Sequence, residues 1–199
     1  NRATEWPRAI PPLGPERALV KAAPGASAYQ SWAGGVKRGA VLLSNGPLLE
    51  FQVNGLEAGT KHNWGGAELK LRGSAEAWFH REVEKIELIV NGEVAAYAGR
   101  TGKDQDRLDF THTLRESAWV AARVKGKSLP GEPEIWAHTN PIYFLREGKP
   151  VRKSAARQAL QARWRQEAEY YRNSQLPLSR EQRTELEETV RRTTQALAE

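Results

Sequence analysis

Apolar and polar side chains alternate in short runs across residues 48–146, and this period of two constrains the fold of the chain most. The clearest run spans residues 85–90 and ends at Asn91-Gly92, after which residues 94–98 continue the alternation. Asn-Gly supplies the positive φ angles of a two-residue hairpin turn. The segment therefore predicts a β-hairpin in which each strand turns one face to the interior.

Other runs repeat the pattern and are separated by turn residues, with no helical period between them. They are Leu49, Phe51 and Val53 before Asn54-Gly55; Leu69 and Leu71; and Leu108, Phe110, His112 and Leu114. Residues 118–124 and residues 142–145 are two further apolar strands. Because a half-buried sheet needs a second layer to cover it, the pattern predicts an antiparallel β-sandwich over residues 48–150. The chain lacks the cysteines of antibody domains, so the sandwich is immunoglobulin-like in architecture only.

Residues 1–47 predict an irregular strap with one short helix, because prolines punctuate the start of this segment. The helix is expected over residues 26–36, with Ser27 as its N-cap and Gly34-Gly35 weakening its end. One side of this helix would carry Tyr29, Trp32 and Val36 at helical spacing.

Residues 151–199 predict a two-helix extension, so the whole chain is expected to be mainly β with a C-terminal α part. Ser154 can cap the first helix, whose stripe is Ala156, Leu160, Trp164, Ala168 and Tyr171. After a break at residues 173–177, Ser179 and Gln182 have the spacing of a capping box. The second helix carries Leu186, Val190, Thr193 and Leu197 on one face.

Composition excludes several kinds of chemistry. The chain has no cysteine, which excludes disulfides, thiolate metal sites and cysteine nucleophiles, and it has no methionine, which predicts a processed chain or a fragment of a longer protein. No apolar run approaches the ~20 residues of a membrane helix, so no membrane span is expected. The net charge of +6 is a weak signal, and the arginines of residues 157–192 are interspersed with glutamates. Mixed charge is typical of a solvated helix face and does not favour nucleic-acid binding.

No metal site or catalytic residue can be assigned. The four histidines, His62, His80, His112 and His138, are isolated in sequence, so no local pair can present two ligands to one metal. His112 has a core-facing position in an alternating run, whereas His138 is expected in a polar turn that precedes a strand. Ser44 lacks the G-x-S-x-G context of a nucleophile and is interpreted as a turn former before Asn45, Gly46 and Pro47.

The segment from Gly39 to Leu49 resembles the G-x-x-x-x-(S/T)-N-G-P-L-L junction of the CehA/McbA family, the carbaryl-hydrolase-like branch of the PHP metal-dependent hydrolases. Later segments fit the same family in order: residues 53–55, the hairpin of residues 86–94, the strand of residues 117–124 and the run of residues 137–143. The resemblance extends over nearly the whole chain and includes Gly14 and Arg17 near its start.

The resemblance implies that this chain is an accessory part of a hydrolase and does not itself carry the catalytic residues. In that family, histidines and aspartates of a preceding PHP domain bind the divalent metal, so no cofactor and no catalytic residue is transferred to this chain. Residues 1–47 would be the remnant of that catalytic domain, 48–150 an accessory sandwich and 151–199 a helical extension. The partner would be the chain's own upstream catalytic domain, and export from the cytoplasm is favoured because members of the family often have exported sequences.

The resemblance also places candidate interface residues. Trp119 and Arg123 would lie in a central strand, and His138, Asn140 and Tyr143 at a sandwich end or interface. Ser44, Asn45, Gly46 and Pro47 would form a structural hinge. The alternative hypothesis is a stand-alone β-sandwich module that binds carbohydrate or protein.

Overall fold

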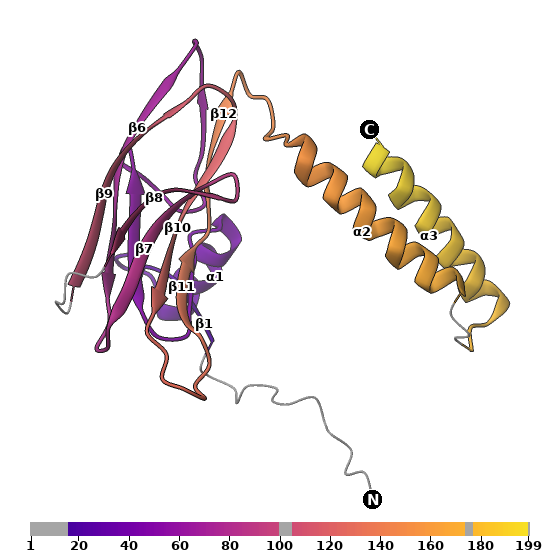
Figure 1. Ribbon diagram of the computed structural model, residues 1–199, viewed down its shortest axis with the longest axis horizontal. Coiled ribbons are helices and arrows are strands. Elements are labelled where there is room, and N and C mark those ends of the chain that lie inside the picture. The colour runs from indigo at the N-terminus through magenta and orange to yellow at the C-terminus, as the bar shows by residue number, and fades with distance from the viewer. Residues whose placement is uncertain (1–15, 100–104, 174–176, 199) are drawn as a thin grey trace, which may run out of the picture. The chain divides into compact units, whose positions relative to one another are not determined.

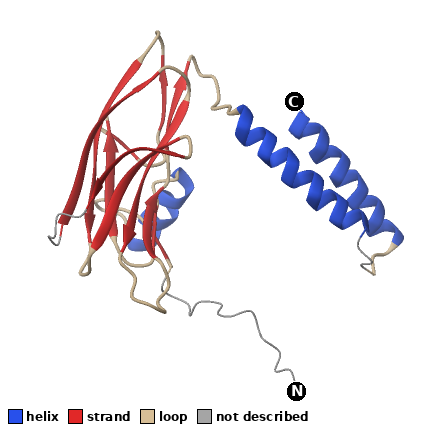
Figure 2. Cartoon of the chain, in the orientation of Figure 1, coloured by secondary structure: helices blue, strands red, loops and turns tan. Residues whose placement is uncertain are grey.

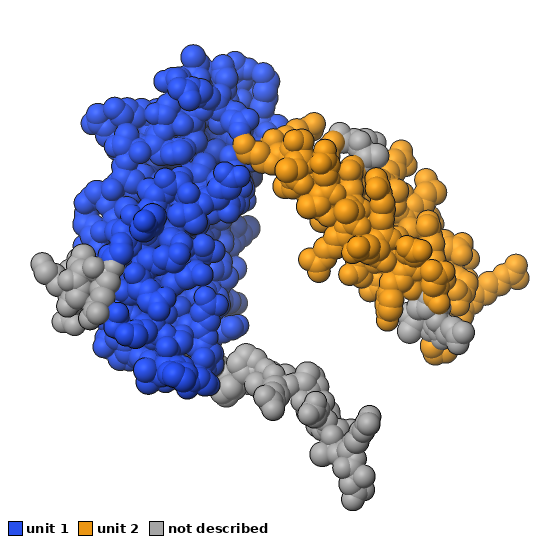
Figure 3. All heavy atoms as spheres, in the orientation of Figure 1, with its two compact units in different colours: residues 1–151 blue, residues 152–199 orange. Residues whose placement is uncertain are grey.

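The computed structural model describes residues 16–99, 105–173 and 177–198, a mainly β chain followed by helices (Figure 1 and Figure 2). The chain divides into two compact units, residues 1–151 and residues 152–199 (Figure 3). The first unit contains β1 (Arg17–Leu19), α1 (Ala28–Arg38), β2 (Leu42–Ser44), β3 (Leu48–Val53), β4 (Leu56–Glu57), β5 (Lys61–Trp64), β6 (Leu69–Trp78), β7 (Val83–Val90), β8 (Glu93–Gly99), β9 (Gln105–Leu114), β10 (Ala118–Gly126), β11 (Ile135–Thr139) and β12 (Ile142–Arg146). The second contains α2 (Ser154–Asn173) and α3 (Arg180–Ala198).

The strands of the first unit form two sheets. The smaller sheet has the order β4-β3-β6-β9, and its strands are antiparallel. In the larger, eight-stranded sheet, β7 and then β8 lie along one edge of β10, while β11 and β12 share its other edge. Beyond β11 the sheet continues with β2 and β1, and beyond β12 it continues with β5, which is parallel to β12.

Both sheets contribute buried side chains to one hydrophobic core. In β3 the burial alternates as the sequence predicts, with Leu49, Phe51 and Val53 buried and the intervening residues exposed. Leu71 of the small sheet and Phe144 of the large sheet are both fully buried members of this core. The structure therefore confirms a mainly β fold of two sheets in a β-sandwich-like arrangement, followed by C-terminal helices.

The predicted Asn-Gly hairpin is confirmed. Asn91 and Gly92 have φ angles of 53° and 95° and join β7 to β8. The turn is also held to β10, because Asn91 N–H donates to Trp119 O and Asn91 Oδ1 accepts from Trp119 N–H, both at 3.0 Å. A turn that closes one hairpin thus also fixes the end of the next strand in the sheet.

Helix α1 forms as predicted but ends later. Ser27 caps it in a capping box with Gln30, and Gly39 closes it in the left-handed conformation. The helix continues through both internal glycines to Arg38. Gly35 lies so close to Val20 that a Cβ atom would collide with that side chain. Tertiary contact explains this glycine better than helix termination does.

The segment expected to be an irregular strap also contributes two strands. β1 pairs with β2, and β2 pairs with β11, so residues 17–19 and 42–44 extend the large sheet. Each strand has only three residues, which is too short for an alternating pattern to indicate it. The prolines at positions 7, 11, 12 and 15 lie outside the described residues.

The second unit is the predicted helical hairpin. The capping box of α3 is present in both directions, since Ser179 N–H donates to Gln182 Oε1 and Gln182 N–H donates to Ser179 Oγ. Trp164 Nε1 donates to Thr194 Oγ1 at 3.0 Å, which joins α2 to α3. Val190 is fully buried between the helices, whereas Leu160 of the predicted stripe is 54% exposed.

Candidate functional site

Arg123 and His138, two of the predicted interface residues, lie opposite each other in the large sheet. Arg123 pairs with His138 of β11 on one edge of β10 and with Glu87 of β7 on the other. The neighbouring Ala122 and Val124 are fully buried, so Arg123 belongs to the outer face of the sheet. Because directly opposite residues share a face, Glu87, Arg123 and His138 form one row across three strands.

Glu87 is the buried member of this row, with a side chain that is 2% exposed. Its Oε1 lies 2.5 Å from Lys85 Nζ, and its Oε2 lies 2.7 Å from Arg123 Nε and 2.6 Å from Arg123 Nη2. Desolvation raises the pKa of this carboxyl, but the hydrogen bonds and charges of Lys85 and Arg123 outweigh it and hold the pKa below the ordinary value. The carboxylate therefore stays ionised and holds both cations over the sheet.

His138 lies within strand β11, and the prediction that it occupies a polar turn before a strand is wrong. Its ring stacks on Trp136 of the same face, with centroids 5.3 Å apart and planes at 16°. The interruption comes two residues later, at Asn140-Pro141, because proline has no N–H to continue the ladder. Where β10 changes its partner from β11 to β12, Ala122 N–H donates to the side chain of Thr139 instead of to a backbone carbonyl, at 3.1 Å from Oγ1.

Trp119 and Tyr143 form a second cross-strand pair on β10 and β12. Tyr143 N–H donates to Thr60 O, and Asn140 N–H donates to Val41 O, both through the backbone. Asn140 thus lies between β11 and β12, at the point where their partners change. The five predicted interface residues thus lie on or beside one edge of β10. Arg123 is opposite His138 of β11, Trp119 is opposite Tyr143 of β12, and Asn140 lies between β11 and β12.

The Ser44–Pro47 junction is held by hydrogen bonds to both sides. Ser44 Oγ donates to Pro47 O at 2.6 Å and accepts from Gly46 N–H at 2.9 Å. The amide of Asn45 imitates a strand, since its Oδ1 accepts from Trp136 N–H at 2.8 Å and its Nδ2 donates to Glu134 O at 2.6 Å. These bonds extend the pairing of β2 with β11 by one side chain.

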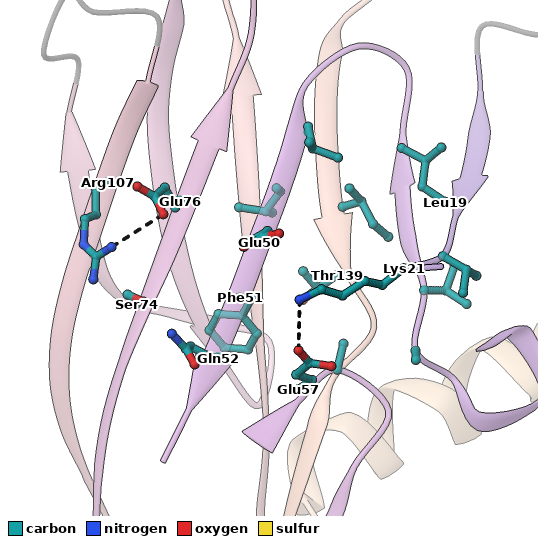
Figure 4. A pocket seen from close by; sticks show the side chains of 17 residues that line it. Leu19, Lys21, Glu50, Phe51, Gln52, Glu57, Ser74, Glu76, Arg107 and Thr139 are labelled. Carbon is teal, nitrogen blue, oxygen red and sulfur yellow. Dashed lines mark hydrogen bonds and ion pairs between the residues drawn. The ribbon is translucent and has the colours of Figure 1, made fainter. Parts of the chain in front are cut away.

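A pocket of about 340 Å³ lies between the edge of β3 and the end of β1 (Figure 4). Its polar lining comprises Lys21, Glu50, Gln52, Glu57, Ser74, Glu76, Arg107 and Thr139. Sequence reasoning missed this site, because Glu50 and Gln52 occupy the outward positions of an ordinary alternating strand. The only usable signal was the Asn54-Gly55 turn, which returns the chain along β3 for two residues.

The histidines lie in separate places and do not fit a shared metal site. His62 packs against Phe144, His80 against Phe79 and His138 against Trp136, while His112 lies in β9. Over residues 16–99, 105–173 and 177–198, no three carboxylate or imidazole side chains converge as metal ligands would.

Within the described ranges, none of the helices combines the length and apolar character needed to cross a membrane. The chain matches no protein-family model, and a search among curated proteins finds no match.

Proposed function

We propose that this chain is a non-catalytic accessory domain of a PHP-like metal-dependent hydrolase of the CehA/McbA type, and that it packs on the catalytic domain through α1. The observation that carries the proposal is an uncovered apolar side of this helix. Tyr29, Trp32 and Val36 are 76%, 46% and 43% exposed. They lie in the segment that the family resemblance assigns to the end of the catalytic domain.

The physical argument rests on how α1 is held. The capping box at Ser27 and the Gly39 cap order both ends of the helix, and the contact of Gly35 with Val20 fixes its inner side. Trp32 Nε1 donates to Ala18 O at 3.2 Å, so its ring has a defined orientation while it remains accessible. Ordered, exposed aromatic side chains are typical of the centre of a protein interface.

We also infer that the two sheets form an immunoglobulin-like sandwich. The support is the pairing order, in which β3, β6 and β9 form one layer and β8, β7, β10 and β12 the other.

Binding in trans tests the interface. The chain is titrated into a separately purified PHP-type catalytic domain of the CehA/McbA family and the heat is measured. Trp32→Ser and Tyr29→Ser are each expected to weaken binding at least tenfold, as loss of an aromatic hot spot does. Tyr97→Ser, at a 71% exposed tyrosine of β8, is the matched control and should leave binding unchanged. Equal affinity of all four proteins would contradict the proposal.

Activity assays test the other half of the proposal. The chain alone, supplied with Mn²⁺ or Zn²⁺, should not hydrolyse phosphoesters or carbamates above the uncatalysed rate. Hydrolysis that depends on metal and increases with the concentration of this chain would contradict a non-catalytic role. Elemental analysis of the purified chain gives an independent readout, and a stoichiometric bound metal would count against it.

A stand-alone carbohydrate-binding module is the second candidate, and the stacked Trp136–His138 pair favours it. Sugar rings stack on exposed aromatic faces, and Arg123 of the same face could donate hydrogen bonds to hydroxyl groups. A glycan array probed with the chain and with Trp136→Ala tests it. Glycan binding that the substitution abolishes would favour this function over the accessory role.

A further inference from the structure

One edge of β3 has no strand beside it along residues 49–51 in the described part of the chain. Asn54 N–H donates to Arg72 O, which shows that the even-numbered residues of this segment turn their backbone groups to β6. Leu49 and Phe51 therefore turn their N–H and C=O groups to the opposite edge. There β4 covers only Gln52 and Val53, so the backbone groups of Leu49 and Phe51 form an open edge.

The edge is open because the chain leaves it early. β4 ends at Glu57, and Gly59 N–H then donates to Pro141 O, which lies between β11 and β12 of the large sheet. The following strand, β5, pairs with β12 in the large sheet and does not continue along β3. The segment that would have covered Leu49 and Phe51 has thus crossed between the layers, and the pocket of about 340 Å³ occupies its place.

The walls of this pocket favour a particular pattern of side chains. Its inner wall is apolar, with Val41 and Leu42 both 8% exposed, whereas Glu50 occupies an exposed position of β3. A strand added beside β3 would place alternate side chains against this inner wall and the others beside Glu50. The charged lining residues are Glu50, Glu57 and Glu76 against Lys21 and Arg107, which leaves an acidic excess.

An ion pair spans one end of the pocket. Lys21 Nζ lies 3.3 Å from Glu57 Oε1, and the two side chains are 71% and 64% exposed (Figure 4). An ion pair this exposed contributes little stability, so a ligand can displace it at small cost. Displacement also releases Glu57 to face a basic side chain of the ligand.

We propose that this groove binds an extended segment of a partner protein in which apolar and basic residues alternate, and that the segment adds a strand to the edge of β3. Main-chain hydrogen bonds to Leu49 and Phe51 supply the affinity. The apolar wall and the acidic outer rim supply the selectivity, as in other cases of β-strand addition. Tyr29, Trp32 and Val36 do not line this pocket, and the proposal does not depend on the hydrolase assignment.

A synthetic peptide tests the proposal on the full chain. The probe is a fluorescein-labelled octapeptide in which valine and lysine alternate, and its binding is followed by fluorescence anisotropy. Two matched peptides are controls: one with glutamate in place of lysine, and one N-methylated at alternate amides so that it cannot pair with a strand edge. Binding of the first peptide and not of the controls is expected, and equal binding of all three would overturn the proposal.

Two variants give effects of opposite sign. Glu50→Lys is expected to weaken binding about fivefold, through the loss of one exposed attraction and the gain of a repulsion. Lys21→Ala opens the ion pair and removes a repelling charge, so it should strengthen binding about twofold. Glu84→Lys, at an exposed position of β7 outside the pocket, is the control for net charge. If Glu50→Lys and Glu84→Lys weakened peptide binding equally, the proposal that the peptide binds beside β3 would be overturned.

Amide exchange locates the added strand directly. In the free chain the amides of Leu49 and Phe51 should exchange rapidly, and saturation with the peptide should protect both at least tenfold. The amide of Glu50, which faces β6, serves as the internal reference. Slow exchange of Leu49 and Phe51 before peptide is added would overturn the proposal, because another segment of this chain or a second copy would then already cover the edge.

Discussion

Arg123 and Glu87 make a two-pronged contact across neighbouring strands, in which Nε and Nη2 of the arginine both lie within 2.7 Å of the same carboxylate oxygen. The carboxylate is 2% exposed, while the side chains of Arg123 and Lys85 are 40% and 39% exposed. The anion is therefore desolvated and its two cations are only partly so. Such a carboxylate depends on its partners far more than a surface carboxylate does.

Removing one of these partners should be costly. Arg123→Ala is expected to lower the free energy of unfolding by about 1–3 kcal/mol, less than for a fully buried pair because the arginine is partly solvated. Urea unfolding followed by tryptophan fluorescence measures the change. Lys125→Ala, on the same strand and face and 3.7 Å from the exposed Glu134, is the control. A loss at Arg123 no greater than the loss at Lys125 would contradict the role of the pair.

The same carboxylate predicts a pH dependence. The pKa of Glu87 is lower in the folded chain than its ordinary value of 4.5. Its stabilising contribution is therefore fully present above that ordinary value and is lost as the pH falls through the lowered pKa. The difference in unfolding free energy between the wild type and Glu87→Gln should be constant near neutral pH and shrink at acidic pH. Chemical unfolding at a series of pH values measures it.

A control at an exposed position distinguishes this effect from general charge repulsion. Glu84→Gln lies on the same strand as Glu87 and should give a small difference at every pH. A Glu87→Gln difference that grows as the pH falls would have the wrong sign for a lowered pKa and would contradict the assignment.

Short sequence patterns predicted correctly those parts of the fold that depend on a few consecutive residues. The alternation in β3 and the turn at Asn91-Gly92 are confirmed, because side-chain period and positive φ are properties of a few consecutive residues. Strands β1 and β2 were not predicted, because three residues are too few to show an alternation of apolar and polar side chains. The end of α1 was predicted too early, because Gly35 was interpreted as weakening the end of the helix. Glycine is needed at this position because Val20 packs against it, and the sequence alone does not show that contact.

The site depends still more on distant residues. Glu87 occupies an outward position of an alternating strand, and only the pairing of β7 with β10 reveals that Arg123 covers it. The pocket exists because the chain crosses between the sheets after Glu57, and no local pattern reports such a crossing. The sequence therefore identified Arg123 and His138 as separate candidates. Their position opposite each other follows only from the register between β10 and β11.

The two glycines of α1 should respond to alanine with opposite signs. At Gly34 an added Cβ would meet only the far end of the Arg38 side chain, at 3.2 Å, so Gly34→Ala should stabilise the chain by about 0.5–1 kcal/mol through helix propensity. At Gly35 the Cβ would collide with Val20, so Gly35→Ala should destabilise it by about 1–3 kcal/mol. Thermal unfolding of both variants measures the pair. Stabilisation by both would show that α1 does not pack against Val20.

The junction at Asn45 should behave as a fixed element. Asn45→Ala removes two hydrogen bonds to the backbone of residues 134–136, and we expect it to cost about 1–2 kcal/mol, a fall in Tm of about 2–8 °C. Asn45→Asp should not restore the loss, because it sets a carboxylate oxygen against Glu134 O. Asn63→Ala, at an exposed asparagine of β5, is the control and should leave Tm unchanged. A hinge that bends at residues 44–47 would tolerate Asn45→Ala as well as it tolerates Asn63→Ala. An unchanged Tm in both variants would therefore favour the hinge expected from the sequence over the hydrogen-bonded junction.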